Sequence, residues 1–299
     1  GPIPPAVAPP ADIVLRQGDA DGGNDLEAGM RLSAAVIFGA GANLEFTFMG
    51  GNQWRSTAAV TDNNPVYFSV ISDFGTNPVG GFDDTDRSLL QSVTSDSDFH
   101  SAEINYRRRT VGPYGHFQGS WLVGLRYLRF TNSLLYSTFG EEDNAIGNLR
   151  YFQSDDKFKN RLFGPQAGMD LWWNCHAGVN FGIGLKGAWV QNDLERRTVL
   201  TANSLGAGAT PGGVLITNTD QDTTVMGEFE AKMVYRLSHS WSIRSAYYAI
   251  AVDDIAFADV SPQTIRGLLP PESPCRASST EPGGGILAML RGDRQIGCL

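Results

Sequence analysis

Most of the chain consists of segments in which apolar and polar residues alternate with a period of two, the pattern of a β-strand with one apolar face. In residues 179–189 the odd positions are largely apolar and the even positions polar or small, and residues 225–237 repeat this split with charged even positions. Six more segments alternate in the same way: residues 26–38, 43–49, 102–107, 120–127, 163–171 and 241–248. The pattern predicts an all-β fold with at least eight antiparallel strands.

The spacing of these segments predicts how they connect. Short stretches of turn-forming residues join them in pairs, at 39–41, 111–116, 174–176 and 238–240. Between the pairs the connections are long, at about 45 residues after Gly51, about 30 after Asn132 and about 30 after Gln191. Short turns at one end and long loops at the other are typical of outer-membrane barrels, whose turns are periplasmic and whose loops are extracellular.

We therefore expect an antiparallel up-and-down transmembrane β-barrel of 8 to 12 strands over residues 26–258. A Pro/Asp/Gly-rich segment, residues 1–25, precedes it, and an irregular Pro- and Gly-rich tail, residues 259–299, follows it. Further strands could come from residues 13–16, 54–60, 66–72 and the tail.

In a barrel of this kind the polar face of each strand points inward. Cations and carboxylates on that face nearly cancel, as a paired interior requires. The residues expected to line the lumen are Arg31, Glu45, Glu103, Arg107, Arg126, Asp170, Lys186, Glu228, Glu230, Lys232, Arg236 and Arg244. These charges suit either an ion-selective conduit or a salt-bridged plug, and the number of strands decides which, since eight leave room only for side chains.

The opposite face of the strands is apolar and rich in aromatic residues near the expected turns, as in the interfacial girdle of a membrane barrel. The residues expected to face lipid or its interface are Trp121, Trp172, Trp173, Phe181, Trp189, Phe229, Tyr235 and Trp241. A soluble β-sandwich used for adhesion, which would turn the apolar face inward, is the alternative for an all-β chain.

Composition and charge limit the classes of partner that the chain can bind. The net charge of −9 and the absence of a basic block argue against nucleic acid. The longest apolar stretch, residues 172–185, is too short for a membrane-spanning helix. The expected partners are outer-membrane lipid and, through acidic loops, further copies of the chain or neighbouring envelope proteins. The acidic residues assigned to loops are Asp83, Asp84, Asp86, Asp96, Asp98, Glu141, Glu142, Asp143, Asp155, Asp156, Asp220 and Asp222.

No catalytic or metal-binding motif emerges from the sequence. The three cysteines lack the spacing of a zinc site, although Cys275 and Cys298 could pair in an oxidising compartment. Residues 19–25 have the acidic spacing of a calcium loop, but Met30 stands where the closing glutamate belongs. The four histidines are scattered and no hydrolase elbow is present. We expect no enzyme activity, no metal site and no cofactor.

Two consecutive strands carry a family resemblance. Residues 99–109 read FHSAEINYRRR, and residues 121–130 read WLVGLRYLRF after a turn. Together with FGPQAG at 163–168 and GIGLKG at 182–187, these motifs resemble the beta-barrel porin family of bacterial outer membranes. The resemblance covers approximately residues 26–258 and implies an outer-membrane location and a pore-like role, as a passive diffusion channel for small solutes or ions. Unlike the family pattern, this chain ends in a Pro-, Gly- and Arg-rich tail.

Overall fold

The strands form one antiparallel sheet in the order of the chain. A computed structural model describes residues 15, 20, 29–63, 67, 83–85, 87–110, 116–143, 148–176, 178–207, 210–237, 241–253, 255–256 and 289–298. Each strand in this part of the chain pairs with the next, which confirms the all-β, up-and-down prediction. The strands are β1 (Met30–Gly39), β2 (Ala42–Thr61), β3 (Ser88–Thr110), β4 (Phe117–Asp143), β5 (Asn148–His176), β6 (Val179–Ala207), β7 (Thr210–Arg236), β8 (Trp241–Val252) and β9 (Met289–Cys298). The described residues contain no helix long and apolar enough to cross a membrane.

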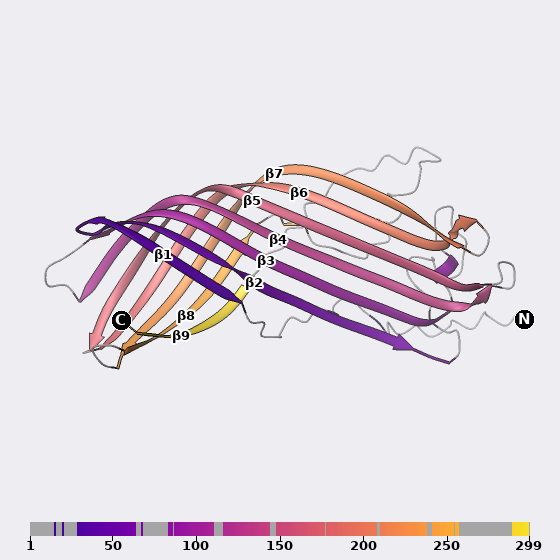
Figure 1. The fold of residues 1–299 in the computed structure, drawn as a ribbon, viewed down its shortest axis with the longest axis horizontal. Helices are drawn as coiled ribbons and strands as arrows, with labels where there is room; N and C mark the ends of the chain where they lie inside the picture. The colour runs from indigo at the N-terminus through magenta and orange to yellow at the C-terminus, as the bar shows by residue number, and fades with distance from the viewer. Residues whose placement is uncertain are drawn as a thin grey trace, which may run out of the picture.

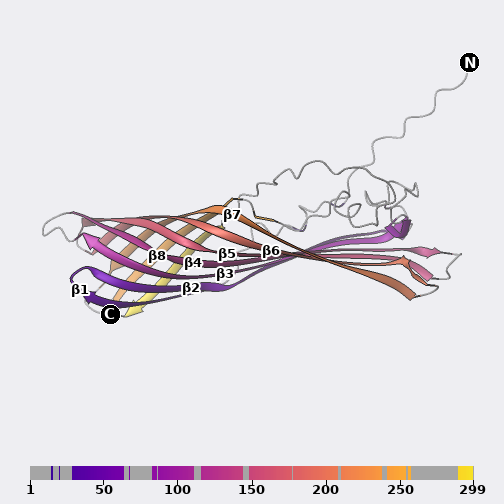
Figure 2. The ribbon, with the colours of Figure 1, turned by 90° about the horizontal axis from the view of Figure 1, so that it is seen from above.

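The sheet has two halves of different shape. All nine strands take part in the curled half, which carries the short turns and lies at the left of Figure 1. Only β2–β7 continue into the extended half, a flatter, twisted ribbon at the right of Figures 1 and 2. β1, β8 and β9 are 10 to 12 residues long, whereas β4–β7 reach 27 to 29 residues.

Two of the three connections expected to be long loops are instead paired strand. β4 and β5 pair from Phe117 opposite Trp173 to Asp143 opposite Asn148, and β6 and β7 pair from Val179 opposite Tyr235 to Ala207 opposite Thr210, each with one register shift near the far end. Consequently Asp96, Asp98, Glu141, Glu142, Asp143, Asp155, Asp156, Asp220 and Asp222 are strand residues, and their assignment to loops was wrong. The tail contributes β9, one of the further strands for which the sequence left room.

The third long connection is strand at both ends, in β2 and β3, whereas its middle and most of the N-terminal segment lie outside the described residues. Between β2 and β3 the structure describes Tyr67, which bridges to Ser88, and a short 3-10 turn at Asp83–Thr85. Of the proposed extra strands, residues 54–60 belong to β2. The calcium-like segment 19–25, apart from Ala20, and the proposed Cys275–Cys298 pairing fall outside this part of the chain.

The sheet curls without closing through its backbone. Among the described residues β1 pairs only with β2, and β9 only with β8. The inner face of β1 nevertheless reaches the far side of the curl. Arg31 lies 3.6 Å from a Glu230 carboxylate oxygen on β7 and 4.3 Å from the centre of the Tyr248 ring on β8.

The two faces of the sheet exchange their polarity between the halves. In the curled half of β5 the inner, even positions include Gln166 and Asp170, and the outer ones Met169 and Leu171. In the extended half the inner positions carry Phe152 and Phe158 and the outer ones Asp155 and Lys157, although the alternation of buried and less buried positions continues unbroken. The core of the extended half thus lies on its inner face, where Leu15, Ala20 and Ala256 pack against the sheet.

On β2 the exchange of polarity between the two faces coincides with a β-bulge at a glycine. The pairing with β3 shifts between Met49 and Asn52, and Gly51 adopts φ +79°, a conformation that favours glycine. Beyond this bulge the inner positions of β2 change from odd to even, so that Trp54 packs against the buried apolar residues.

Candidate functional site

A buried network of charges fills the middle of the curled half. Arg126 on β4 donates a hydrogen bond to Glu228 on β7 and lies 3.9 Å from Glu103 on β3. The Lys186 ammonium on β6 lies 3.0 Å from a Glu103 carboxylate oxygen and 2.9 Å from a Glu228 oxygen. Gln166 on β5 also donates to Glu103, at 2.9 Å. We call Glu103, Arg126, Lys186 and Glu228 the central cluster; all four side chains are buried.

A second group of charges, the rim cluster, lies nearer the short turns. Asp170 on β5 accepts hydrogen bonds from Arg107 on β3 and from Lys232 on β7, the latter at 3.0 Å. Arg107 also binds Glu45 at 2.8 Å, and Lys232 lies 2.6 Å from Glu230. Arg31, which pairs with Glu230, completes the cluster. The two clusters together balance five cations with five carboxylates, so each buried charge has an opposite charge nearby.

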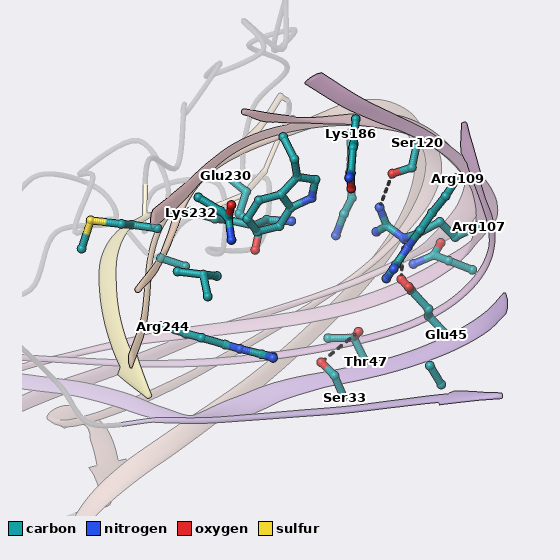
Figure 3. A pocket seen from close by; sticks show the side chains of 18 of the residues that line it. Ser33, Glu45, Thr47, Arg107, Arg109, Ser120, Lys186, Glu230, Lys232 and Arg244 are labelled. Atoms are coloured by element: carbon teal, nitrogen blue, oxygen red, sulfur yellow. Dashed lines mark hydrogen bonds and ion pairs between the residues drawn. The ribbon is translucent and has the colours of Figure 1, made fainter. Parts of the chain in front are cut away.

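A cavity of about 770 Å³ lies over the rim cluster and extends to the short turns. Figure 3 shows side chains from opposite walls of the curl converging on it. Residues near the turns, including Thr110, Gln118, Asn174 and Asn180, line its outer part. Two further lining residues, Arg109 and Arg244, belong to neither cluster.

Apolar side chains fill the interior beyond the central cluster. Leu128 and Phe130 follow Arg126 on the inner face of β4, and Val190 follows Lys186 on β6. We call this group the apolar plug, and its members are at most 2% exposed: Phe99, Leu128, Phe130, Leu162, Val190, Met226, Ile250, Val252 and Ile255. Within the described part of the chain the cavity is therefore closed at its inner end, first by the charged side chains of the central cluster and then by the apolar plug.

The structure brings together ten of the twelve residues expected to line a lumen, namely the five cations and five carboxylates of the two clusters. Arg244 lines the cavity without an ion pair to another described residue. Arg236 lies exposed at the end of β7 and does not line the cavity.

Seven of the eight aromatic residues expected to face outward lie exposed on the outer face, and one does not. Trp121, Trp173, Phe181, Trp189, Phe229, Tyr235 and Trp241 are 39% to 69% exposed. Trp172 shares the inner face with Asp170, lines the cavity and has the Lys232 ammonium 5.7 Å from its ring centre. Its assignment to the outer face was wrong, because consecutive strand residues point to opposite faces and Trp173 takes the outer one.

Four residues of the site are not among those expected to line a lumen. Gln166 and Asn105 complete the shell of hydrogen bonds around Glu103, and Arg109 and Trp172 line the cavity. The period of two could have found all four, since each shares its position in the alternation with a charged inner residue two to four places away.

The described residues contain no group of histidine, cysteine, aspartate and glutamate arranged to hold a metal ion. Cys175 is a free thiol, and His100 lies 3.4 Å from Asp98 outside both clusters. Compared with family models, with curated proteins and with solved structures, the chain has no match.

Proposed function

We propose that this protein is a bacterial outer-membrane β-barrel whose filled interior makes it an anchor and assembly unit rather than an open channel. The observation that carries the proposal is the outer face of the curled half, where exposed apolar side chains cover neighbouring strands. Representative residues of this apolar belt are Leu32, Phe46, Ile104, Trp121, Leu125, Phe163, Leu171, Phe181, Leu185, Trp189, Phe229 and Tyr235. A soluble monomer rarely exposes a continuous apolar surface larger than a few hundred Å².

The dimensions of the belt fit a bilayer. On β6 it runs from Phe181 to Trp189, about the 9–11 residues with which a tilted strand crosses a membrane. Beyond it the same face of β6 carries Gln191, Asp193 and Glu195, which suit water or lipid headgroups. In this arrangement the curled half is embedded and the extended half projects from the membrane.

The same geometry weighs against the soluble sandwich. A sandwich buries its apolar faces against a second sheet, whereas the described strands all belong to one sheet. The buried ion pairs of the two clusters also lie on the inner face, which would face solvent if the apolar outer face were the packed face of a sandwich.

The filled interior favours an anchor. The central cluster and the apolar plug occupy the cross-section of the curl, and nine strands lie close to the eight that leave room only for side chains. The extended half would then be the part that meets other copies or neighbouring envelope proteins, through the charged outer face of β3–β6.

One observation favours a diffusion channel as the second candidate. The cavity is wide and polar at the turn end, so displacement of the plug would turn it into the mouth of a conduit. Planar-bilayer recording separates the two functions. An anchor gives a silent bilayer although heat-modifiable gel mobility proves a folded, inserted protein. A channel gives discrete steps whose ion selectivity changes in Arg244→Glu but not in Arg236→Glu, the matched variant outside the cavity.

The membrane proposal itself has a simpler test. The folded protein should need detergent or lipid to stay in solution. If the chain is monodisperse in buffer without detergent and its circular dichroism spectrum shows folded β structure, the outer-membrane proposal is wrong and the soluble β-sandwich is favoured.

A further inference from the structure

The walls of the cavity carry more positive than negative charge. Arg31, Arg107, Lys186 and Lys232 line it, but each is already paired within the two balanced clusters. Arg109 and Arg244 line it as well, and neither has an ion pair with any described residue. Among the described side chains that line it, the cavity therefore presents two surplus guanidinium groups.

These two arginines approach the cavity from different walls. Arg109 comes from the turn end of β3 and Arg244 from β8 on the other side of the curl, and in Figure 3 both side chains point toward the middle of the cavity. Both are exposed, so that a solute can reach them. A guanidinium offers several hydrogen-bond donors in a fork that matches carboxylate and phosphate oxygens.

Neutral donors and an aromatic ring surround the pair. Gln118, Asn174 and Asn180 line the cavity near Arg109, and Trp172 forms part of its inner wall. Amide groups and a ring face suit the uncharged part of a small polar solute. The volume of about 770 Å³ lies within the range of small-molecule sites, and the filled floor excludes a polymer threading through.

We propose that the cavity is a binding site for a compact dianion, held between Arg109 and Arg244. Two charges match the surplus of two, whereas a monoanion leaves one arginine without a counter-charge. A phosphate monoester and a dicarboxylate share this chemistry, and binding in a blind cavity makes the protein a receptor for the solute rather than its conduit.

Calorimetric titration of the full-length protein in detergent tests the site. The probes are glucose 6-phosphate and succinate, with glucose and acetate as the neutral and singly charged comparisons. We expect one or both dianions to bind, to bind more weakly as salt is raised, and to lose at least about tenfold in affinity in the Arg109→Gln/Arg244→Gln double variant. The two dianions distinguish a phosphate ester from a dicarboxylate as the preferred ligand.

Arg236→Gln is the matched control, because this exposed arginine lies at a strand end outside the cavity. It should bind the dianions as the unmodified chain does, and heat-modifiable mobility should show that all variants are folded. Equal affinity in the double variant, or no heat from either dianion with the folded unmodified chain, overturns the site. Either result leaves the bilayer recordings unaffected, so this proposal and the anchor proposal fail separately.

Discussion

Arg126 is the residue on which the interior of the curled half depends most. It is 1% exposed and is one of the two cations, with Lys186, that lie between Glu103 and Glu228, two carboxylates on different strands. Arg126→Met keeps much of the volume but leaves Lys186 alone to neutralise both carboxylates. Removing one partner of a buried ion pair costs about 3 to 5 kcal/mol. We expect a loss of this size in urea unfolding in detergent, against less than about 0.5 kcal/mol for the exposed Arg236→Met; similar losses would contradict the role of the central cluster.

Gly182 makes room for Trp172 on the inner face. The two residues are opposite each other on β5 and β6, and a Cβ atom at Gly182 would lie 2.9 Å from the indole ring. Gly182→Val therefore has to displace the ring from the cavity wall, at a cost of about 1 to 3 kcal/mol. Gly187→Val on the same strand is the control, because nothing lies within 4 Å of its added Cβ and valine favours strands. Urea unfolding should show a loss for the first variant only.

The sequence predicts single residues well wherever one strand can be read on its own. The alternation placed Glu103, Asp170 and Lys186 on one face, and the structure pairs Glu103 with Lys186 in the central cluster and Asp170 with Lys232 in the rim cluster. At Trp172 the aromatic ring suggests the membrane interface, but its position beside Trp173 in the alternation places it on the inner face. Which cation meets which carboxylate depends on how the strands stagger and curl, and a period of two carries no information about either.

At the level of the strand, the sequence did not predict the extended half of the sheet, because its inner positions are apolar and its outer positions polar, the reverse of the curled half. The inner face of β5 is polar at Gln166 but apolar at Phe158, so no single alternating pattern follows the whole strand. In β3 the polar composition of residues 94–98 predicts a loop, whereas these residues lie opposite β2 and β4 in continuous pairing. Only that pairing shows that the polar stretches are strands.

The reversal predicts that the two halves of one strand tolerate a charge differently. Leu185 and Val199 both lie on the outer face of β6, the first within the apolar belt and the second in the extended half. In lipid vesicles, Leu185→Arg should cost about 2 to 4 kcal/mol in unfolding free energy, the cost of arginine at the bilayer midplane. Val199→Arg should stay within about 1 kcal/mol, since its site faces water. Equal costs would mean that the belt does not lie in the bilayer.

At the level of the whole molecule, the direction of the strands limits how the curl can close. β1 ends at the turn with β2, and β9 ends opposite Trp241, the first residue of β8, so β1 and β9 both run toward the short turns. An antiparallel closure therefore joins β1 to β8, and it requires β9 to leave the edge of β8 with which it is paired in the structure. Unpaired edges are costly in hydrocarbon, which makes such a closure favourable. The contacts of Arg31 with Glu230 and Tyr248 bring β1 toward β8, as this closure requires.

This argument predicts that eight strands form the stable unit. A chain ending at residue 258 lacks β9 but keeps β8 and the apolar plug, so it should still migrate faster before boiling than after it on a gel. A chain ending at residue 237 lacks β8 as well, which removes the strand that β1 would join on closure and the Ile250, Val252 and Ile255 side chains of the plug. Its mobility should not depend on heating. If the chain ending at residue 258 also loses heat-dependent mobility, then β9 takes part in closure, and β1 does not close on β8.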